Sequence, residues 1–261
     1  VVSTHIPNNA GSLEPLTVSA PEGCILNAPK PTAVASRHVI GQMLPDVTFG
    51  CLRQAVPERV PAEGTSCLWN INVRGRVKGG EGGNYGFGMA ITSNGGTGAR
   101  PDKDGLSATA YPSGVRGTPV EIAETQTPLI FWRKEFRPDS GGAGRTRGGL
   151  GQIMEIESGI AEPFDLLAAF DRIDHPPRGR DGGADGEAGF VALKAGGKLK
   201  GKGFQLIPPG DRLVIMTPGG AGIGAPKERD RVQVANDLAD GLISEEAADK
   251  LYAYKPSQAA E

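Results

Sequence analysis

The sequence predicts an α+β fold with β-rich mixed sheets, a helical segment near the N-terminus and two helices at the C-terminus. Between residues 67 and 211, short runs of alternating apolar residues follow one another, and glycine-rich or Pro-Gly turns separate them. Apolar residues recur at helical spacing in residues 31–56 and again in residues 230–252. A block of strands flanked by helices is typical of layered β structure rather than of repeated βαβ units.

Residues 1–66 are expected to form a strand followed by a kinked helical segment. Alternating apolar residues in 16–20 predict the strand, and the Pro-Glu-Gly turn at 21–23 ends it. Apolar residues in 31–56 approximate one face of a helix. Because proline breaks the helical hydrogen-bond ladder, we expect a break or kink at Pro45, with Pro45 in the first turn of a second helix.

Residues 67–226 are expected to form a glycine-rich β domain, and residues 227–261 the C-terminal helices and a tail. The expected strands are residues 68–73, 87–91, 129–136, 152–156, 164–170, 190–193 and 212–217. One helix should run through 230–240 and end before Gly241, because glycine favours the left-handed conformation found after helix ends. Ser244 is suited to cap the last helix.

Composition excludes several classes of protein. The chain has 261 residues and a formal net charge of −2, which provides no basic field for nucleic acid or an anionic membrane. Its longest apolar runs are far too short to span a bilayer. The three cysteines have no CxxC spacing, and no signal peptide is recognised. Buried, reduced thiols in the cytoplasm are therefore expected.

The 40 glycines gather in clusters, of which residues 137–151 are the most informative. Successive glycines let backbone N–H groups converge on an anion, and the arginine forks of this cluster match phosphate or carboxylate. The candidates for binding substrate or phosphate are Arg137, Asp139, Ser140, Gly141, Gly142, Arg145 and Arg147. Glycines also mark bulges and tight crossings, so a structural role for the cluster stays open beside direct contact with a ligand.

Other candidate sites have weaker patterns. Arg37, His38, Arg100 and Asp104 form a second tier of candidates. The glycine clusters lack the spacing of a phosphate-binding Walker A loop, and no nucleophile elbow is present. Asp171, Asp174 and His175 could share one turn, but a metal site needs three or four convergent ligands. We therefore expect no metal site in this chain, and the catalytic residues stay unassigned.

Five ordered motifs resemble the hydantoinase B family, which includes the B half of 5-oxoprolinases and the large subunits of acetone carboxylases. The main motif is FRPDSGGAGR at 136–145 with RGGLG at 147–151. The other four are NAG, APEG and NAP between residues 9 and 29, GGTGAR with DG at 95–105, PGGAGIGAP at 218–226, and DGLISEEAA at 240–248. The resemblance extends over essentially the whole chain and corresponds to the C-terminal half of such a subunit.

The resemblance implies an ATP-dependent hydrolase of cyclic amides such as hydantoins or 5-oxoproline. A hydantoinase A-type partner with an actin-like ATPase fold would bind ATP and Mg²⁺ and phosphorylate the substrate carbonyl. The B subunit would then complete ring opening, with the arginines of residues 137–147 stabilising the phosphate. The implied partners are this ATPase and the N-terminal half of the B subunit, which would complete the domain of residues 1–66 and hold a divalent metal. A higher oligomer is expected.

Apart from the resemblance, a β-rich binder of carbohydrate or anions is a rival, but two Trp and four Tyr leave few stacking platforms. Two alternatives within the resemblance also stay open. The first is a subunit of an ATP-dependent ketone carboxylase, in which an enol phosphate meets a carboxyl donor. The second is a structural and interface module, with the chemistry in the N-terminal half and the partner, since His, Cys and Asp show no convergent set in this sequence.

Overall fold

The computed structural model describes residues 10–14, 16–34, 36–80 and 83–255. The chain divides into two compact units, residues 1–41 and 42–261. The domain boundaries expected after residues 66 and 226 stay a prediction. Among the described residues, no helix is long and apolar enough to cross a membrane.

The N-terminal unit contains α1 (Ala10–Leu13) and the beginning of α2 (His38–Leu52). The strand predicted at residues 16–20 is wrong, because these residues adopt no regular structure. Val18 is 94% exposed, and no strand pairs with this segment among the described residues. Alternation produces a strand only where a neighbouring strand and an apolar layer are available, and this segment has neither.

Helix α2 continues through Pro45, so the prediction of two helices separated at this residue is wrong. Proline removes the hydrogen bond to the carbonyl four residues earlier, at Gly41. Gly41 is exposed, and water can therefore satisfy that carbonyl. On the far side of Pro45, the Thr48 hydroxyl donates to the Leu44 carbonyl at 2.9 Å.

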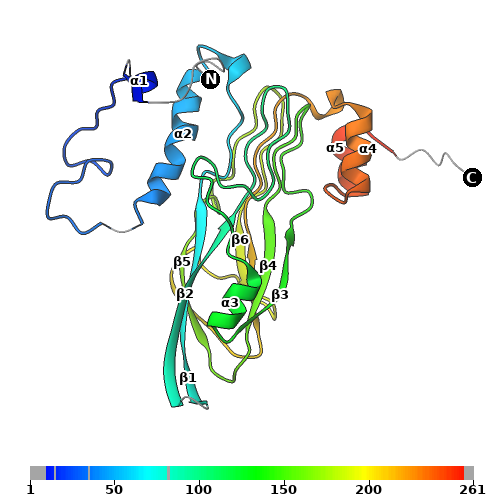
Figure 1. The fold of residues 1–261 in the computed structure, drawn as a ribbon. Coiled ribbons are helices and arrows are strands. Elements are labelled where there is room, and N and C mark those ends of the chain that lie inside the picture. The colour runs from blue at the N-terminus through cyan, green and yellow to red at the C-terminus, as the bar shows by residue number, and fades with distance from the viewer. Residues whose placement is uncertain (1–9, 15, 35, 81–82, 256–261) are drawn as a thin grey trace, which may run out of the picture. The chain divides into compact units, whose positions relative to one another are not determined.

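Two four-stranded antiparallel sheets form the body of the second unit (Figure 1). The first has the order β2-β1-β5-β7, with bounds Gly83–Asn94, Leu68–Gly80, Phe164–Ala169 and Lys202–Ile207. The second has the order β3-β4-β8-β6, with bounds Leu129–Phe136, Gln152–Ser158, Arg212–Met216 and Phe190–Leu193. The α+β class is confirmed, with antiparallel rather than mixed pairing between these strands. Strand β7 and the short helix α3 (Val120–Gln126) were not predicted.

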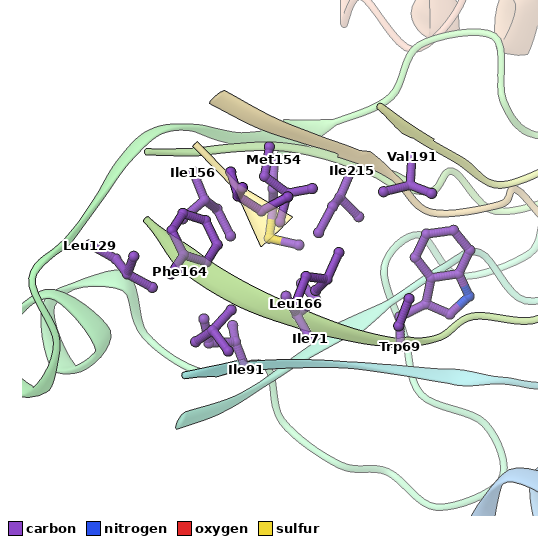
Figure 2. Close-up of a cluster of buried hydrophobic side chains, with 14 of the residues drawn as sticks. Trp69, Ile71, Ile91, Leu129, Met154, Ile156, Phe164, Leu166, Val191 and Ile215 are labelled. Carbon is purple, nitrogen blue, oxygen red and sulfur yellow. The ribbon is translucent and has the colours of Figure 1, made fainter. Parts of the chain in front are cut away.

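The hydrophobic core lies between the two sheets (Figure 2). Side chains such as Ile71 and Leu166 from the first sheet face Met154 and Ile156 from the second. Each of these positions belongs to an alternating apolar pattern, because every second side chain of a strand points to the same face. Trp69 ends this core and stacks on Phe170 with ring centroids 4.3 Å apart.

Extended glycine-rich segments run side by side at one end of the sheets (Figure 1). We call residues 95–108, 140–151, 179–189 and 217–224 the glycine layer. Their backbone hydrogen bonds recur three residues apart, as in Gly96 N to Pro218 O at 3.1 Å and Ala99 N to Ala221 O at 2.8 Å. A three-residue repeat is the period of a polyproline II-type helix, which has no internal hydrogen bonds and must bond to its neighbours when buried.

Glycine is required in this layer because the backbones approach closely. A Cβ atom on Gly96 would collide with the carbonyl of Gly149, and one on Gly220 would collide with the carbonyl of Thr97. Neither glycine has a positive φ, so space rather than conformational freedom demands it. The structural role left open for the 137–151 cluster is therefore present in the fold.

Helices α4 (Arg231–Ala239) and α5 (Glu245–Tyr252) end the described chain, as predicted. Asp230 caps α4, Gly241 follows it with φ +68°, and the Ser244 hydroxyl accepts from the Ala247 N–H at 3.1 Å. The two helices and the glycine layer share a small apolar cluster: Ala143, Val234, Ile243, Ala248 and Tyr252.

Candidate functional site

A cavity of about 540 Å³ opens beside the glycine layer and α4. It brings together three of the residues predicted from sequence, Arg100, Asp104 and Arg145. The other lining residues are Asp102, Lys103, Gly105, Leu106, Thr146, Glu228, Asp230 and Gln233. The wall thus combines three cations with four carboxylates, and its chemistry depends on which of these charges are already paired.

Arg145 and Lys103 carry the unpaired positive charges of this cavity within the described residues, and the planar guanidinium of Arg145 is the better match to a phosphate. The backbone of Arg145 is fixed by a hydrogen bond from its N–H to the Gly224 carbonyl at 3.2 Å. Its side chain is exposed and forms no hydrogen bond or ion pair within the described part of the chain. Arg100 is less available, since its guanidinium donates to the Asp104 carbonyl at 2.7 and 3.1 Å. A rigid backbone with an unused guanidinium is suited to holding an external anion.

A buried ion network lies beneath the cavity. Arg229 donates to both oxygens of Asp104, at 2.8 and 2.6 Å, and to Asp237 at 2.8 Å. Arg147 pairs with Asp237 through two bonds of 3.2 Å, and its backbone N–H donates to Asp104 at 2.6 Å. Asp104 is therefore a structural carboxylate that faces two arginines, rather than a free base.

The network shifts the pKa of Asp104 and of Arg229. Burial alone would raise the pKa of Asp104, but its bonds with Arg229 outweigh burial and hold this pKa below the ordinary value. Asp104 in turn raises the pKa of Arg229 against the effect of burial. Burial also raises the pKa of Tyr252, on α5 beside the network, to about 12. Asp104 and Arg229 are thus both charged at neutral pH, and the Tyr252 phenol beside them is neutral.

The other residues of the 137–151 cluster make contacts within the protein. Arg137 donates to the carbonyl of Ala188 at 2.7 Å. Asp139, at φ +60°, accepts from the Ser244 N–H at 2.8 Å and so holds the start of α5. The buried Ser140 hydroxyl donates to the Arg137 carbonyl at 2.6 Å and accepts from the Gly151 N–H at 3.0 Å.

Gly141 and Gly142 lie inside the glycine layer. A Cβ on Gly141 would collide with the carbonyl of Gly148, and the N–H of Gly142 donates to the Gly220 carbonyl at 2.8 Å. Arg37 and His38 are exposed residues of the N-terminal unit. For all these residues, a part in ligand binding stays a prediction.

Metal ligands do not converge in the described residues, where no group of three or more His, Cys, Asp or Glu could hold an ion. Asp171, Asp174 and His175 line a second cavity of about 630 Å³. Asp171 pairs there with Lys202 at 2.6 Å. This second cavity is lined by three lysines, which suits it poorly to a cation.

Two parts of this arrangement were missed from sequence. Arg229 and Asp237 stand 125 and 133 positions after Asp104, and no spacing rule connects them. A second network, far from these residues in sequence, joins Asp46 and Glu63 through Arg172 at 3.1 and 3.2 Å. In the sequence these residues are scattered single charges, and no local pattern indicates that they pair.

Comparison with known proteins gives consistent relatives. The family described as Hydantoinase B/oxoprolinase matches residues 1–226. An uncharacterised protein of Methanocaldococcus jannaschii is 35% identical over 260 residues, covering 98% of this chain and 44% of that protein. The 5-oxoprolinase PfmaA of Pestalotiopsis fici is 30% identical over 257 residues, covering 93% of this chain and 19% of that protein.

Solved structures share the fold. The ATP-dependent caprolactamase of Pseudomonas jessenii matches with a TM-score of 0.75 and 24% identity, covering 94% of this chain and 44% of that one. The nucleotide-free acetone carboxylase matches with a TM-score of 0.57 and 21% identity, covering 83% of this chain and 33% of that one. The chain spans less than half the length of each of these four proteins.

Proposed function

The chain belongs to the Hydantoinase B/oxoprolinase family, and we propose that it is part of the B-type subunit of an ATP-dependent cyclic-amide hydrolase. Two relatives support this substrate class by name, a 5-oxoprolinase and an ATP-dependent caprolactamase. 5-Oxoproline and caprolactam are both lactams. An amide resists attack by water because its nitrogen donates electrons to the carbonyl. Phosphorylation of the carbonyl oxygen would give an imidate phosphate that water can open.

The cavity beside Arg145 carries the proposal. Arg145 presents an unpaired guanidinium within the described chain, and Arg100 and Lys103 line the same cavity. We assign to Arg145 the holding of the substrate phosphate, with Lys103 adding charge. Fixed cations placed where negative charge develops stabilise a transition state strongly, because they need no reorganisation. Arg147 would act indirectly, by keeping the floor of the cavity in place.

Activation of the substrate would come from a hydantoinase A-type partner. In this proposal an actin-like ATPase subunit binds ATP and Mg²⁺, and a divalent metal belongs to the N-terminal half of the B subunit. The described residues of this chain offer no ligand group for a metal, so no step of its chemistry is assigned to one here. The subunits would assemble into a higher oligomer in the cytoplasm.

A reconstituted complex of this chain, the remaining B-subunit half and the ATPase tests the proposal. We expect 5-oxoproline, hydantoin or caprolactam to stimulate ATP hydrolysis, with the ring-opened product formed in step. Acetone with bicarbonate is the matched alternative, because the acetone carboxylase shares the fold. ATP hydrolysis that responds to acetone and bicarbonate, and to none of the cyclic amides, would replace the hydrolase by the carboxylase.

A further inference from the structure

Arg180 is a buried cation that has no partner in the part of the chain that the structure describes. Its residue surface is 5% exposed, and its Nη1 atom is buried with no hydrogen-bond partner. Within the described residues, the guanidinium takes part in no hydrogen bond or ion pair. Arginines are almost never buried unless paired, and the guanidinium cannot shed its charge by losing a proton. Such a group indicates a missing counter-charge.

The backbone of Arg180 is held firmly in the glycine layer. Its N–H donates to the Gly222 carbonyl at 3.0 Å. Its carbonyl accepts from Gly183 at 2.8 Å and from Gly224 at 3.0 Å. A Cβ on the preceding Gly179 would collide with the carbonyl of Gly183, which leaves the chain little room to rearrange. The position of the cation is therefore set by the fold.

Carboxylates near Arg180 are already used by other arginines. Asp181, the next residue, pairs with Arg53 at 2.8 Å. Burial first, and then the positive charge of Arg53, lower the pKa of Arg180. The carboxylates of Glu63, Asp46 and Asp181 act in the opposite direction but do not outweigh these two effects, and none of the three contacts the Arg180 guanidinium.

The carboxylates of the second network, Asp46 and Glu63, are also paired with arginines. Glu63 accepts from Arg178 Nε at 2.8 Å and from Arg172 at 3.2 Å. Asp46 accepts from Arg172 at 3.1 Å and from the Gly64 N–H at 3.1 Å. Both acids are therefore already paired with arginines, since Arg172 contacts both and Arg178 contacts Glu63. The guanidinium of Arg180 therefore remains able to bind a further anion.

We propose that Arg180 anchors an oxyanion site, whose carboxylate or phosphate ligand comes from outside this chain. Arg180 does not line the cavity of Arg145, so the site is additional to the one in the proposed function and does not rest on it. Two sources share this chemistry: a free anion, or a carboxylate side chain of an adjoining polypeptide. A guanidinium with so little exposed surface suits a single carboxylate or phosphate group rather than a large ligand.

Thermal unfolding of the full chain, with and without inorganic phosphate or formate, tests the site. The variants are Arg180→Met, which keeps the volume without the charge, and Arg116→Met, an exposed control. Potassium chloride at equal ionic strength corrects for general salt effects. Without anion, Arg180→Met should unfold at the same temperature as wild type or higher, because an unpaired buried charge is removed. Phosphate should raise the unfolding temperature of wild type and Arg116→Met in a saturable way, and Arg180→Met should bind phosphate at least tenfold more weakly.

Assembly with the remaining B-subunit half and the ATPase distinguishes the sources. If a polypeptide carboxylate fills the site, phosphate has little effect on the free chain, and Arg180→Met weakens assembly at least tenfold while Arg116→Met does not. The proposal is overturned if Arg180→Met changes neither phosphate binding nor assembly, or if it destabilises the free chain and leaves the phosphate response intact.

Discussion

Arg147 and Asp237 form a buried, two-pronged ion pair, with Nε–Oδ2 and Nη2–Oδ1 distances of 3.2 Å each. Arg147 belongs to the glycine layer and Asp237 to α4, so the pair fastens the helix to the layer. Arg229 shares Asp237 at 2.8 Å and holds Asp104 at the wall of the cavity. The wall of the candidate site therefore depends on a charge network of which Asp104 lines the cavity, whereas Arg147, Arg229 and Asp237 do not.

The first prediction concerns this network. Asp237→Asn keeps the size of the side chain but leaves Arg147 and Arg229 without their shared carboxylate. Removing one partner of a buried ion pair costs about 3–5 kcal/mol, and we expect a loss of this order in urea unfolding. Asp240→Asn, at the exposed end of the same helix, should stay within about 0.5 kcal/mol of wild type. If Asp237→Asn and Asp240→Asn lowered the unfolding free energy equally, the network would not be stabilising.

The second prediction concerns the glycine layer. Gly96→Ala places a Cβ against the carbonyl of Gly149, and overpacking of this kind costs about 1–3 kcal/mol. Gly50→Ala is the control, because this residue lies in α2 with open space around it. The free energy of unfolding of the control should rise by about 0.5–1 kcal/mol, because alanine favours the helix more than glycine does. Chemical denaturation measures the unfolding free energy of both variants. If Gly96→Ala were as stable as wild type, the segments of the glycine layer could move apart to admit a methyl group, which would contradict the prediction.

The third prediction concerns pH. The folded-state pKa of Asp104 is lowered, so its ionised form stabilises the fold above the unfolded pKa of about 3.9 and this contribution is lost as pH falls through the folded pKa. The difference in unfolding free energy between wild type and Asp104→Asn should therefore shrink as pH falls from about 6 to about 3. Asp102→Asn, a matched change at an exposed residue of the same cavity, should alter the unfolding free energy by no more than about 0.5 kcal/mol.

The fourth prediction concerns the thiols. Burial raises the pKa of Cys67 to about 12, whereas Cys51 is exposed on α2. Since the thiolate is the reactive form, a thiol reagent should modify Cys51 in the native chain and Cys67 only after denaturation. A Cys24→Ser background isolates the two, and mass spectrometry assigns the modified residue. Native labelling of Cys67 would contradict its place in the core.

Sequence patterns predicted the parts of the fold that depend on local chemistry. The alternating positions of Phe87 and Ile91 identified a strand, because one face of it must be buried. Ser244 and Gly241 marked helix ends, since caps are read from single residues. Strand β7 was missed because its run is short and includes glycine and lysine, although Phe204 and Leu206 alternate. In the structure both of these side chains are exposed, so the strand contributes little to the core.

The candidate site was only partly predictable. The glycines around the arginines of residues 137–147 identified these arginines as candidates. The sequence did not distinguish the role of Arg145, which lines the cavity, from that of Arg147, which is buried. That difference arises from Asp237, 90 positions further on. Long-range ion pairs leave no local pattern, so only the three-dimensional structure assigns these two roles.

Substrate-dependent turnover of the Arg145→Met complex tests the central claim most directly. If Arg145 holds the substrate phosphate, formation of the ring-opened product should fall about 100-fold or more, as when one donor to a developing anion is removed, while thermal stability and assembly stay unchanged. Arg116→Met should retain full turnover. Full turnover of Arg145→Met in a complex that responds to a cyclic amide would remove this cavity from the reaction.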